Sequence, residues 1–284
     1  MGILNISDKN FPADLKKITP KVTNLYFKGR FRKNIFEKSL TVVGSRKMTH
    51  YGQRIIENLL PPLVESGVTV ISGFMYGVDQ QAHKITLQTG GMTIAVLGWG
   101  IDWQVEEADK KLYWEIESKG LILSEYPAGI SPQLWMFPRR NRIMAGAARA
   151  VLVIEAALNS GSLITATYAR KYNKKLYAVP GPATSAVSQA TNKLIKEGQA
   201  KMVTEADDIL TDMHWTASVE KSKVHHSPGE SDLLLNLLAN QPLTIDEIAL
   251  SLKTAVEKVS VRLSLLQLKG KIVENDGKYY YKIE

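Results

Sequence analysis

The sequence predicts an α/β protein: a Rossmann-like parallel sheet with helices on both faces, followed by a small C-terminal winged-helix domain. Two observations predict the sheet. From residue 40 onward, short apolar runs alternate with helical stretches, and the runs are continuously apolar, as strands buried on both faces should be. A third observation predicts the winged helix, because three helical patterns and a hairpin pattern end the chain.

The predicted strands are six apolar runs, most of which end in glycine or a small polar residue. Because helical segments separate them, the connections imply parallel strands with right-handed crossovers. One helical stretch, 51–66, contains Pro61-Pro62, which should end or kink that helix near Leu60. The runs are LTVVG (40–44), VTVISG (68–73), TIAVLG (93–98), LILSE (121–125), AVLVIEA (150–156) and KLYAVPG (175–181).

Changes of pattern divide the chain into segments. The stretch before the linker is the sheet domain, and the linker lacks apolar periodicity. In the last segment, Thr244 and Glu247 have the spacing of a capping box, and Asn275-Asp276-Gly277 suits a hairpin turn. The expected segments are a basic extension packing on the sheet domain (1–38), the Rossmann-like domain (39–215), the linker (216–230) and the winged helix (231–284), whose first helix is 231–240.

Charge is unevenly distributed along the 284 residues. The formal net charge is +8, and residues 1–38 hold 9 Lys/Arg against 3 Asp/Glu. From His225 to the end there are 7 Lys/Arg against 8 Asp/Glu. This asymmetry predicts a polyanionic partner for the first part and not for the tail, although a solvated basic face would have the same composition.

Other bulk features exclude some classes of protein. There is no cysteine, which excludes disulfides and thiol chemistry. The N-terminus lacks the apolar core of a signal peptide, and no apolar run approaches the length of a membrane span. We therefore expect a cytoplasmic protein with no membrane partner.

The turns that follow the strands carry the candidate site. The carboxyl ends of parallel strands meet at one edge of a sheet, where ligands bind. Gly44-Ser45-Arg46-Lys47 joins a strand to a helix and suits an anion, although it matches neither the dinucleotide fingerprint nor a P-loop. Ser72-Gly73 closes the next strand, and Ser160-Gly161-Ser162 precedes a later helix with hydroxyl and N–H groups.

The most distinctive stretch is FPRRNR, residues 137–142, in which three arginines crowd around one asparagine. Guanidinium groups suit phosphate, and their mutual repulsion needs an anion or acidic partners. Salt bridges to Glu125 and Glu155 would be a purely structural role, which we expect of at least one arginine. The candidate residues are Phe137, Arg139, Arg140, Asn141 and Arg142.

The number of cationic turns exceeds what one mononucleotide needs, and a string of phosphates would use them all. Aromatic residues lie among these turns, and cations interleaved with aromatics are typical of sites for single strands with unstacked bases. Each aromatic could equally belong to the core. They are Phe74, Tyr76, Trp99, Trp103, Trp135 and Phe137.

Few features of the sequence indicate catalysis. Asp79 and His83 share a helix face, as an acid–base pair or two metal ligands would, but no third ligand has matching spacing. We favour a structural role, with Asp79 as a helix cap and His83 bonded to a neighbouring loop. No G-x-S-x-G elbow is present. We expect no catalytic residue, no metal and no cofactor.

Seven motifs together resemble the DNA-processing protein A family (DprA, also called Smf), over about residues 10–212. The C-terminal winged helix is also frequent in that family. The motifs are VVGSRKMTHYG, SGFMYGVDQQAH, GGMTIAVLGWGID, LSEYPAG, FPRRNRIMAGAARAVLVIEA, SGSLITA and YAVPG, followed by TNKLIKEG.

The resemblance implies a single-stranded DNA-binding protein, not an enzyme, that forms a homodimer. Such a protein protects incoming DNA and helps load the RecA recombinase in natural transformation and recombination. Ser45, Arg46 and Lys47 would then meet backbone phosphate, and the arginines of FPRRNR would line the same groove. Lys175 is a weaker candidate for that groove, and Ser72, Gly73 and Ser162 lie on the convergent turns.

The chain departs from the family pattern in places. Met75-Tyr76 replaces a small residue and a cation, and Glu106-Glu107 brings acidic groups near the third turn, where they would weaken binding. Ala190 replaces a glycine. The winged helix offers Lys258 and Arg262 in its third helix, but its overall charge favours a weak DNA contact or a protein-interaction role.

Two other functions stay open. A Rossmann-like nucleotide phosphoribohydrolase would carry a P-G-G-x-G-T-x-x-E stretch with a catalytic glutamate, whereas the corresponding turn here, NSGSLITA, has no glutamate. A transcription regulator would read duplex DNA with its winged helix, and the nearly neutral third helix argues against that role.

Overall fold

The computed structural model describes residues 1–215 continuously and parts of the remainder. The chain divides into two compact units, with the boundary between residues 218 and 219. The predicted linker 216–230 and most of the predicted helix 231–240 lie outside the described residues. The described parts beyond residue 215 are 234–235, 237–238, 242–252, 254–268, 270–275 and 277–281.

The first unit is built on a nine-stranded sheet with the order β1-β2-β6-β5-β4-β3-β7-β8-β9. In this order, every strand from β6 through β5, β4, β3, β7 and β8 to β9 is parallel to its neighbour. By contrast, β2 pairs antiparallel with β6, and β1 pairs antiparallel with β2. All six predicted strands form. The strands are β1 Gly2–Asn5, β2 Asn24–Gly29, β3 Ser39–Val43, β4 Thr69–Ser72, β5 Thr93–Leu97, β6 Leu121–Ser124, β7 Ala150–Val153, β8 Lys175–Ala178 and β9 Lys201–Met202.

The direction of winding changes between β3 and β7. From β3 the chain adds β4, β5 and β6 on one side, and then crosses back to place β7 on the other side of β3. The two strands pair in register from Leu40 opposite Ala150 to Val43 opposite Val153. In open α/β sheets, such a reversal leaves a crevice at the carboxyl ends of the two strands.

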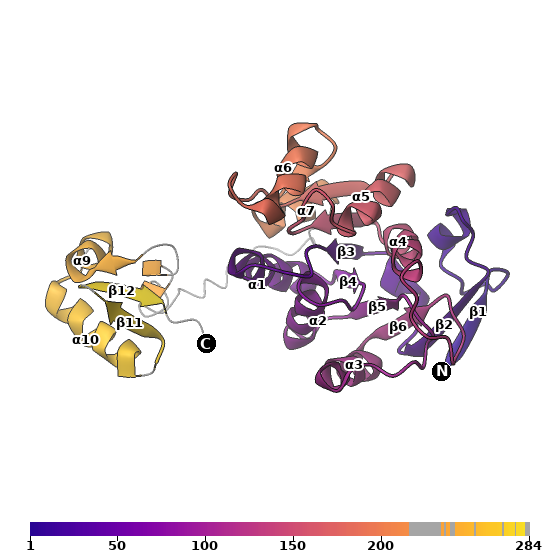
Figure 1. The fold of residues 1–284 in the computed structure, drawn as a ribbon, viewed down its shortest axis with the longest axis horizontal. Helices are drawn as coiled ribbons and strands as arrows, with labels where there is room; N and C mark the ends of the chain where they lie inside the picture. Colours follow the sequence, from indigo (N-terminus) through magenta and orange to yellow (C-terminus); the bar gives the residue numbers. More distant parts are fainter. Residues whose placement is uncertain are drawn as a thin grey trace. The chain divides into compact units, whose positions relative to one another are not determined.

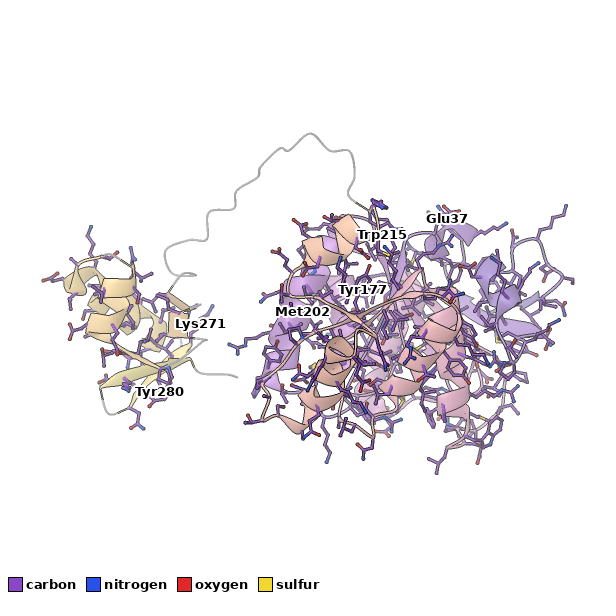
Figure 2. The ribbon with its side chains drawn as sticks, turned by 90° about the horizontal axis from the view of Figure 1, so that it is seen from above. Glu37, Tyr177, Met202, Trp215, Lys271 and Tyr280 are labelled. Carbon is purple, nitrogen blue, oxygen red and sulfur yellow. The ribbon has the colours of Figure 1, made fainter. Side chains whose placement is uncertain are left out.

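Helices cover both faces of this sheet, which confirms the predicted fold class. Figure 1 shows α1, α2 and α3 on one side of the strands and α4 on the other. Strand residues alternate between the two layers, so Val43 packs in the apolar cluster on the α4 side, whereas Val42 packs in the cluster on the α1 side. Tyr177 and Trp215, labelled in Figure 2, belong to the same cluster as Val42. The helices are α1 His50–Glu65, α2 Val78–Gln88, α3 Glu107–Lys119, α4 Met136–Ala147, α5 Ser162–Lys171, α6 Gln189–Lys196 and α7 Ala206–Asp212.

Helix α1 contains two prolines and still runs to Glu65. The predicted end near Leu60 is therefore wrong. Pro61 and Pro62 donate no backbone hydrogen bonds, but Leu60 and Leu63 on either side of them are completely buried. Burial of this apolar face stabilises the last turn against the loss of two donors.

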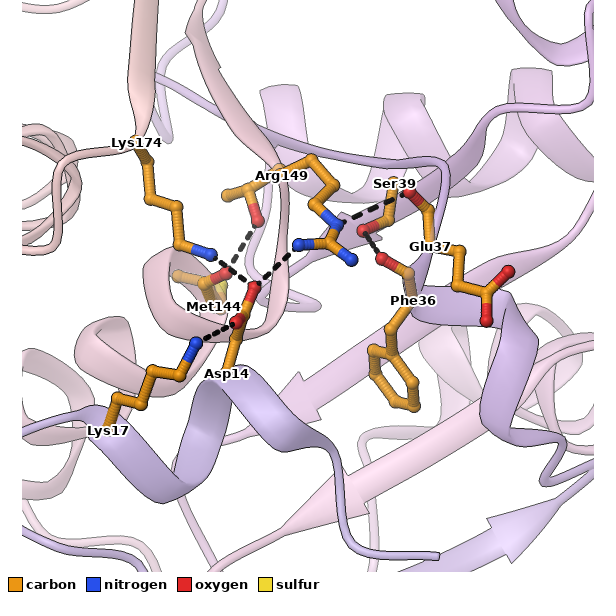
Figure 3. A network of polar contacts seen from close by, with 9 residues as sticks. Asp14, Lys17, Phe36, Glu37, Ser39, Met144, Arg149 and Lys174 are labelled. Carbon is orange, nitrogen blue, oxygen red and sulfur yellow. Dashed lines mark hydrogen bonds and ion pairs between the residues drawn. The ribbon is translucent and has the colours of Figure 1, made fainter.

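The N-terminal segment supplies β1 and β2, and so extends the sheet in addition to packing on it. Its short helix η1, Ala13–Lys17, is fixed through Asp14 (Figure 3). One carboxylate oxygen of Asp14 lies 2.7 Å from Lys174 Nζ and 3.1 Å from Arg149 Nη1. Burial raises the pKa of Asp14, but the hydrogen bond and charge of Lys174 outweigh it and lower the pKa overall.

The second unit matches the predicted winged helix. Its small sheet has the order β10-β12-β11, and the predicted capping box forms, because Thr244 N donates to Glu247 Oε2 at 2.8 Å and Glu247 N donates to Thr244 Oγ1 at 3.3 Å. Gly277 has φ of +74° in the hairpin turn. The elements are β10 Leu243–Thr244, α9 Ile245–Leu252, α10 Val256–Leu268, β11 Ile272–Asn275 and β12 Lys278–Tyr281.

Candidate nucleic-acid interface

A cavity of about 520 Å³ opens at the carboxyl ends of β3 and β7, where the winding of the sheet reverses. Its walls come from segments that are far apart in the sequence. They are the turn after β3 (44–47), the segment that leads into α2 with its first turn (Met75, Asp79), one face of α4 (Phe137, Arg140, Asn141, Met144) and the turn from β7 into the first turn of α5 (157, 159–162, 164 and 165). The predicted convergence of turns therefore occurs for three of the strands.

The N-terminus of α1 already has an internal anion. Thr49, which caps α1, donates its backbone N–H to Glu155 Oε2 at 2.9 Å and its hydroxyl to the other carboxylate oxygen. Gly52 makes room for this carboxylate, since a Cβ there would lie 2.5 Å from Glu155 Oε2. Because Glu155 already places a carboxylate at this helix start, an external anion would have to be held by the side chains of the preceding turn.

The turn after β3 instead offers its side chains. Arg46 and Lys47 are exposed, and Ser45 Oγ accepts a hydrogen bond from Lys47 N at 3.0 Å. The Arg46 guanidinium carbon lies 5.7 Å from the centroid of the Phe137 ring. Gly77, with φ of +75°, lets α2 begin directly against this turn, because a Cβ there would come within 2.7 Å of Arg46 O.

Arg140 is a fixed cation in the cavity wall. The residue is 3% exposed, and its Nη1 donates to Gly73 O at 2.5 Å and to Val96 O. Its Nε donates to Asn141 Oδ1 at 3.2 Å. Burial lowers the pKa of Arg140 to about 10, while the charge of Asp79 acts in the opposite direction. The guanidinium is thus positive at neutral pH and cannot move away from the cavity.

Asp79 also lines the cavity. The residue is in the first turn of α2, whose N-cap is Gly77, so the prediction that Asp79 caps this helix is wrong. Its Oδ2 accepts a 3.4 Å hydrogen bond from Met75 N. Burial raises the pKa of Asp79, and the charge of Arg140 opposes that effect. A buried carboxylate beside an anion site would work against anion binding.

His83 has a structural role, as we expected, but its partner is the first residue of β5 and not a loop residue. Its Nδ1 lies 2.6 Å from Thr93 Oγ1, and the Thr93 hydroxyl donates to Val70 O at 3.0 Å. Because that hydroxyl has one proton, Nδ1 must be the donor of the pair. Burial lowers the pKa of His83 to about 3. The ring is neutral at physiological pH and fixes α2 to the start of β5.

The structure brings seven of the twelve candidate DNA-binding residues to the cavity wall. Ser72 and Gly73 lie behind the wall, since Ser72 is buried and donates to Val42 O at 2.7 Å. Gly73 must lack a Cβ, which would lie 2.6 Å from the Arg140 guanidinium. The seven are Ser45, Arg46, Lys47, Phe137, Arg140, Asn141 and Ser162.

Arg142 does not line any surface, which corrects the expectation that all three arginines share a groove. Its side chain is completely buried and pairs with Glu125 Oε1. Glu125 Oε2 lies 3.4 Å from Arg139 Nε. The structural role predicted for one arginine is thus that of Arg142, with Glu125 and not with Glu155. Arg139 stays 45% exposed just outside the cavity.

Lys175 lies at the wrong edge of the sheet for the predicted groove. It is the first residue of β8, and the cavity is at the carboxyl ends of the parallel strands. Its Nζ lies 2.8 Å from Asp212 Oδ2, and the same carboxylate pairs with Lys201 and accepts a 2.6 Å hydrogen bond from the Tyr177 hydroxyl. This cluster fixes α7 to β8 and β9.

Some cavity residues were not predicted. Thr165 lies one helical turn after Ser162, and this spacing could have identified it. Its buried hydroxyl has no hydrogen-bond partner among the described residues. The family departures Tyr76, Glu106 and Glu107 are not among the lining residues, and the hydrogen bond to Glu106 raises the pKa of Tyr76. The other unpredicted residues include Leu134, Asn159 and Val187.

In the part of the chain that the structure describes, no helix combines the length and apolar character needed to cross a membrane. The same residues contain no group of three or more His, Cys, Asp or Glu side chains placed to hold a metal ion.

The fold and the site define a Rossmann-like protein with a cationic cavity at the reversal of its sheet and a C-terminal winged helix. The chain belongs to the DNA recombination-mediator protein A family, whose model matches residues 2–214. Residues 221–278 match the model of the DprA winged helix domain.

Individual relatives agree with this assignment. Protein Smf of Escherichia coli is 35% identical over 280 residues, which cover 95% of this chain and 74% of that protein. The crystal structure of DprA from Streptococcus pneumoniae superposes with a TM-score of 0.70 at 37% identity, covering 74% of each chain. A structure of DprA from Helicobacter pylori, described for its single-stranded DNA binding mode, has a TM-score of 0.67 at 27% identity, covering 75% of this chain and 95% of that one.

Proposed function

We propose that this chain binds single-stranded DNA at the cavity formed by β3 and β7. The observation that carries the proposal is the cavity wall itself, where Arg46, Lys47 and Arg140 converge on one concave site beside Phe137. Two of these cations are exposed and one is fixed by burial, which suits a strand whose phosphates meet them in turn. The Helicobacter pylori relative, described as binding single-stranded DNA, supports the same assignment.

The domains then have separate tasks. Residues 39–215 form the DNA-binding domain, with the segment 1–38 as part of its sheet, and residues 231–284 form a winged helix joined by the linker 216–230. The sheet domain holds phosphate with Ser45, Arg46, Lys47, Arg140, Asn141 and Ser162. The winged helix makes a weak DNA contact or binds a protein, because its third helix has few cations to offer duplex DNA.

The proposed cellular role follows from the family. We propose that the chain is a cytoplasmic homodimer, that it protects incoming DNA, and that it helps load the RecA recombinase in natural transformation or recombination. The family's description as a recombination mediator supports this role. It predicts that the chain sediments as a dimer and shortens the lag of RecA assembly on a single strand, and a monomer without effect on RecA would contradict it.

We propose a binding protein and not an enzyme. Asp79 is the one carboxylate among the residues that line the cavity, and none of them is histidine or glutamate. A nucleotide phosphoribohydrolase would use a glutamate in the stretch that corresponds to NSGSLITA, residues 159–166, and that stretch has none. Release of a free base from a nucleoside monophosphate would overturn this proposal.

The test is fluorescence anisotropy with labelled oligonucleotides, single-stranded and duplex, at several salt concentrations. We expect the single strand to bind more tightly and its affinity to fall as salt rises, because phosphate contacts release counterions. Binding confined to one duplex sequence would instead favour the transcription regulator. Binding to neither form would contradict the proposed function.

A further inference from the structure

An exposed apolar wall adjoins the phosphate cavity. Of the six aromatic residues near the strand ends, Phe74 and Trp99 are buried in the core beneath α2 and α3. Trp135, by contrast, is 54% exposed, and its neighbour Leu134 is 90% exposed. Large apolar side chains that are this exposed next to a binding site indicate that a ligand or partner covers them.

The wall is linked to the cavity by the residues on either side of Trp135. Leu134 and Phe137 both line the cavity, and Trp135 lies between them in sequence, at the start of α4. The Arg139 guanidinium carbon lies 5.8 Å from the centroid of the Trp135 ring. The Arg46 guanidinium carbon lies 5.7 Å from the centroid of the Phe137 ring. Each of these two aromatic rings thus has a guanidinium group beside it, and cations interleaved with aromatics are the pattern that a strand with unpaired bases uses.

The loop that carries the wall is held by a neighbouring loop. Gly100 N donates to Ile130 O at 2.8 Å, and Gly129 N donates to Asp102 Oδ1 at 2.8 Å. Gly100 permits this approach, since a Cβ there would lie 2.6 Å from Pro127 O. Tyr126 meets the Trp135 ring edge-on, with centroids 6.0 Å apart. The wall is therefore formed before binding, which lowers the entropy cost of stacking.

We propose that Trp135, supported by Leu134, stacks against an unpaired base of the strand whose phosphates occupy the cavity, and that this contact makes the chain prefer single strands to duplexes. The occupant is a base and not a protein side chain because the wall is rimmed by Arg139 and joins a cationic cavity. Bases in a duplex are stacked on each other and offer no free face. This inference rests on the proposed function and adds a base-binding residue to it.

The test compares a normal oligonucleotide with an abasic one of equal length, which keeps every phosphate. Trp135→Ala should bind the normal strand about tenfold more weakly than the unaltered chain does. Its affinity for the abasic strand and the salt dependence of binding should not change, because no phosphate contact is lost. Trp135→Phe keeps an aromatic face and should restore most of the affinity.

Trp114→Ala is the matched control, since Trp114 is 62% exposed but lies on α3, whereas Trp135 stands between the cavity-lining residues Leu134 and Phe137. It should bind like the unaltered chain. If Trp135→Ala binds the normal strand with unchanged affinity while Arg46→Ala binds it poorly, the base wall is wrong and the phosphate cavity stands. If Arg46→Ala also binds normally, the proposed function itself fails.

Discussion

Glu155, at the end of β7, accepts two hydrogen bonds from Thr49, the residue that caps α1. These hydrogen bonds join the segment after β7 to the segment after β3, the two strands between which the winding of the sheet reverses. Many α/β proteins hold a phosphate at this place. Here the Glu155 carboxylate places a negative charge at the positive N-terminal end of α1. The cavity therefore relies on side-chain cations, above all Arg46 and Arg140, for any anion that it holds.

Removing that internal anion should weaken the fold. Glu155→Gln removes the charge of a buried carboxylate and leaves one of the two Thr49 donors without an acceptor at a partly buried site, and we expect the free energy of unfolding to fall by about 1–3 kcal/mol. Urea unfolding followed by circular dichroism measures the change. Glu65→Gln, at the exposed C-terminal end of the same helix, should change stability by less than about 0.5 kcal/mol. Equal effects of the two variants would contradict the role of Glu155.

Asp79 should restrain anion binding. Its carboxylate lines the cavity, so Asp79→Asn removes one negative charge there and should tighten binding of a single strand by about fivefold. Asp207→Asn removes the same charge from an exposed site on α7 and should change affinity little. Anisotropy titration of both variants makes the comparison, and weaker binding by Asp79→Asn would show that its support of Arg140 matters more than its charge.

The pH dependence of binding tests the same residue. Because burial raises the pKa of Asp79, this carboxyl takes up a proton earlier than an exposed one as the pH falls. The net charge of the cavity then becomes more positive, and the affinity of the unaltered chain should rise. Asp79→Asn should lack that rise. Parallel pH profiles of the two proteins would contradict this account.

His83 should make the fold sensitive to acid. Burial lowers its pKa to about 3 in the folded chain, against the usual value near 6.5. Between these values the folded state binds fewer protons than the unfolded state. The stability that the neutral ring contributes near pH 7 is therefore lost as the pH falls, by up to about 1.4 kcal/mol per unit.

The variant His83→Gln tests this by urea unfolding at several pH values. It should be less stable than the unaltered chain at pH 7 but lose less stability between pH 6 and pH 4. His50→Gln, at an exposed position at the start of α1, should keep the pH dependence of the unaltered chain. A His83→Gln profile as steep as that of the unaltered chain would refute the assignment.

The fold was largely predictable because strands buried on both faces are visible as continuous apolar runs. The failures have local physical causes. The two prolines predicted that α1 ends or kinks near Leu60, yet the helix continues to Glu65, with Leu63 buried. The strand β2 of the N-terminal segment was missed because it lies outside the regular alternation of strands and helices, and only its antiparallel pairing with β6 reveals it.

The site was predictable in position but not in detail. Strand ends converge by topology, which placed Arg46 and Arg140 correctly at one edge. Sequence could not tell that Arg140 lines the cavity whereas Arg142 is buried against Glu125, because that depends on the rotation of α4 about its axis. Lys175 illustrates a different limit: its motif lies near the carboxyl end of β8, but the lysine itself begins the strand and faces Asp212.

The central claim is that a single strand is held by the cations at the carboxyl ends of β3 and β7. The most direct measurement is the salt dependence of single-strand affinity for Arg46→Ala and Lys175→Ala, both compared with the unaltered chain. We predict that Arg46→Ala binds at least tenfold more weakly, remains folded, and has a salt slope smaller by about 0.7, as expected for one lost phosphate contact. Lys175→Ala should bind normally. Normal binding by Arg46→Ala, with weakened binding by Lys175→Ala, would place the strand at the opposite edge of the sheet and contradict the account.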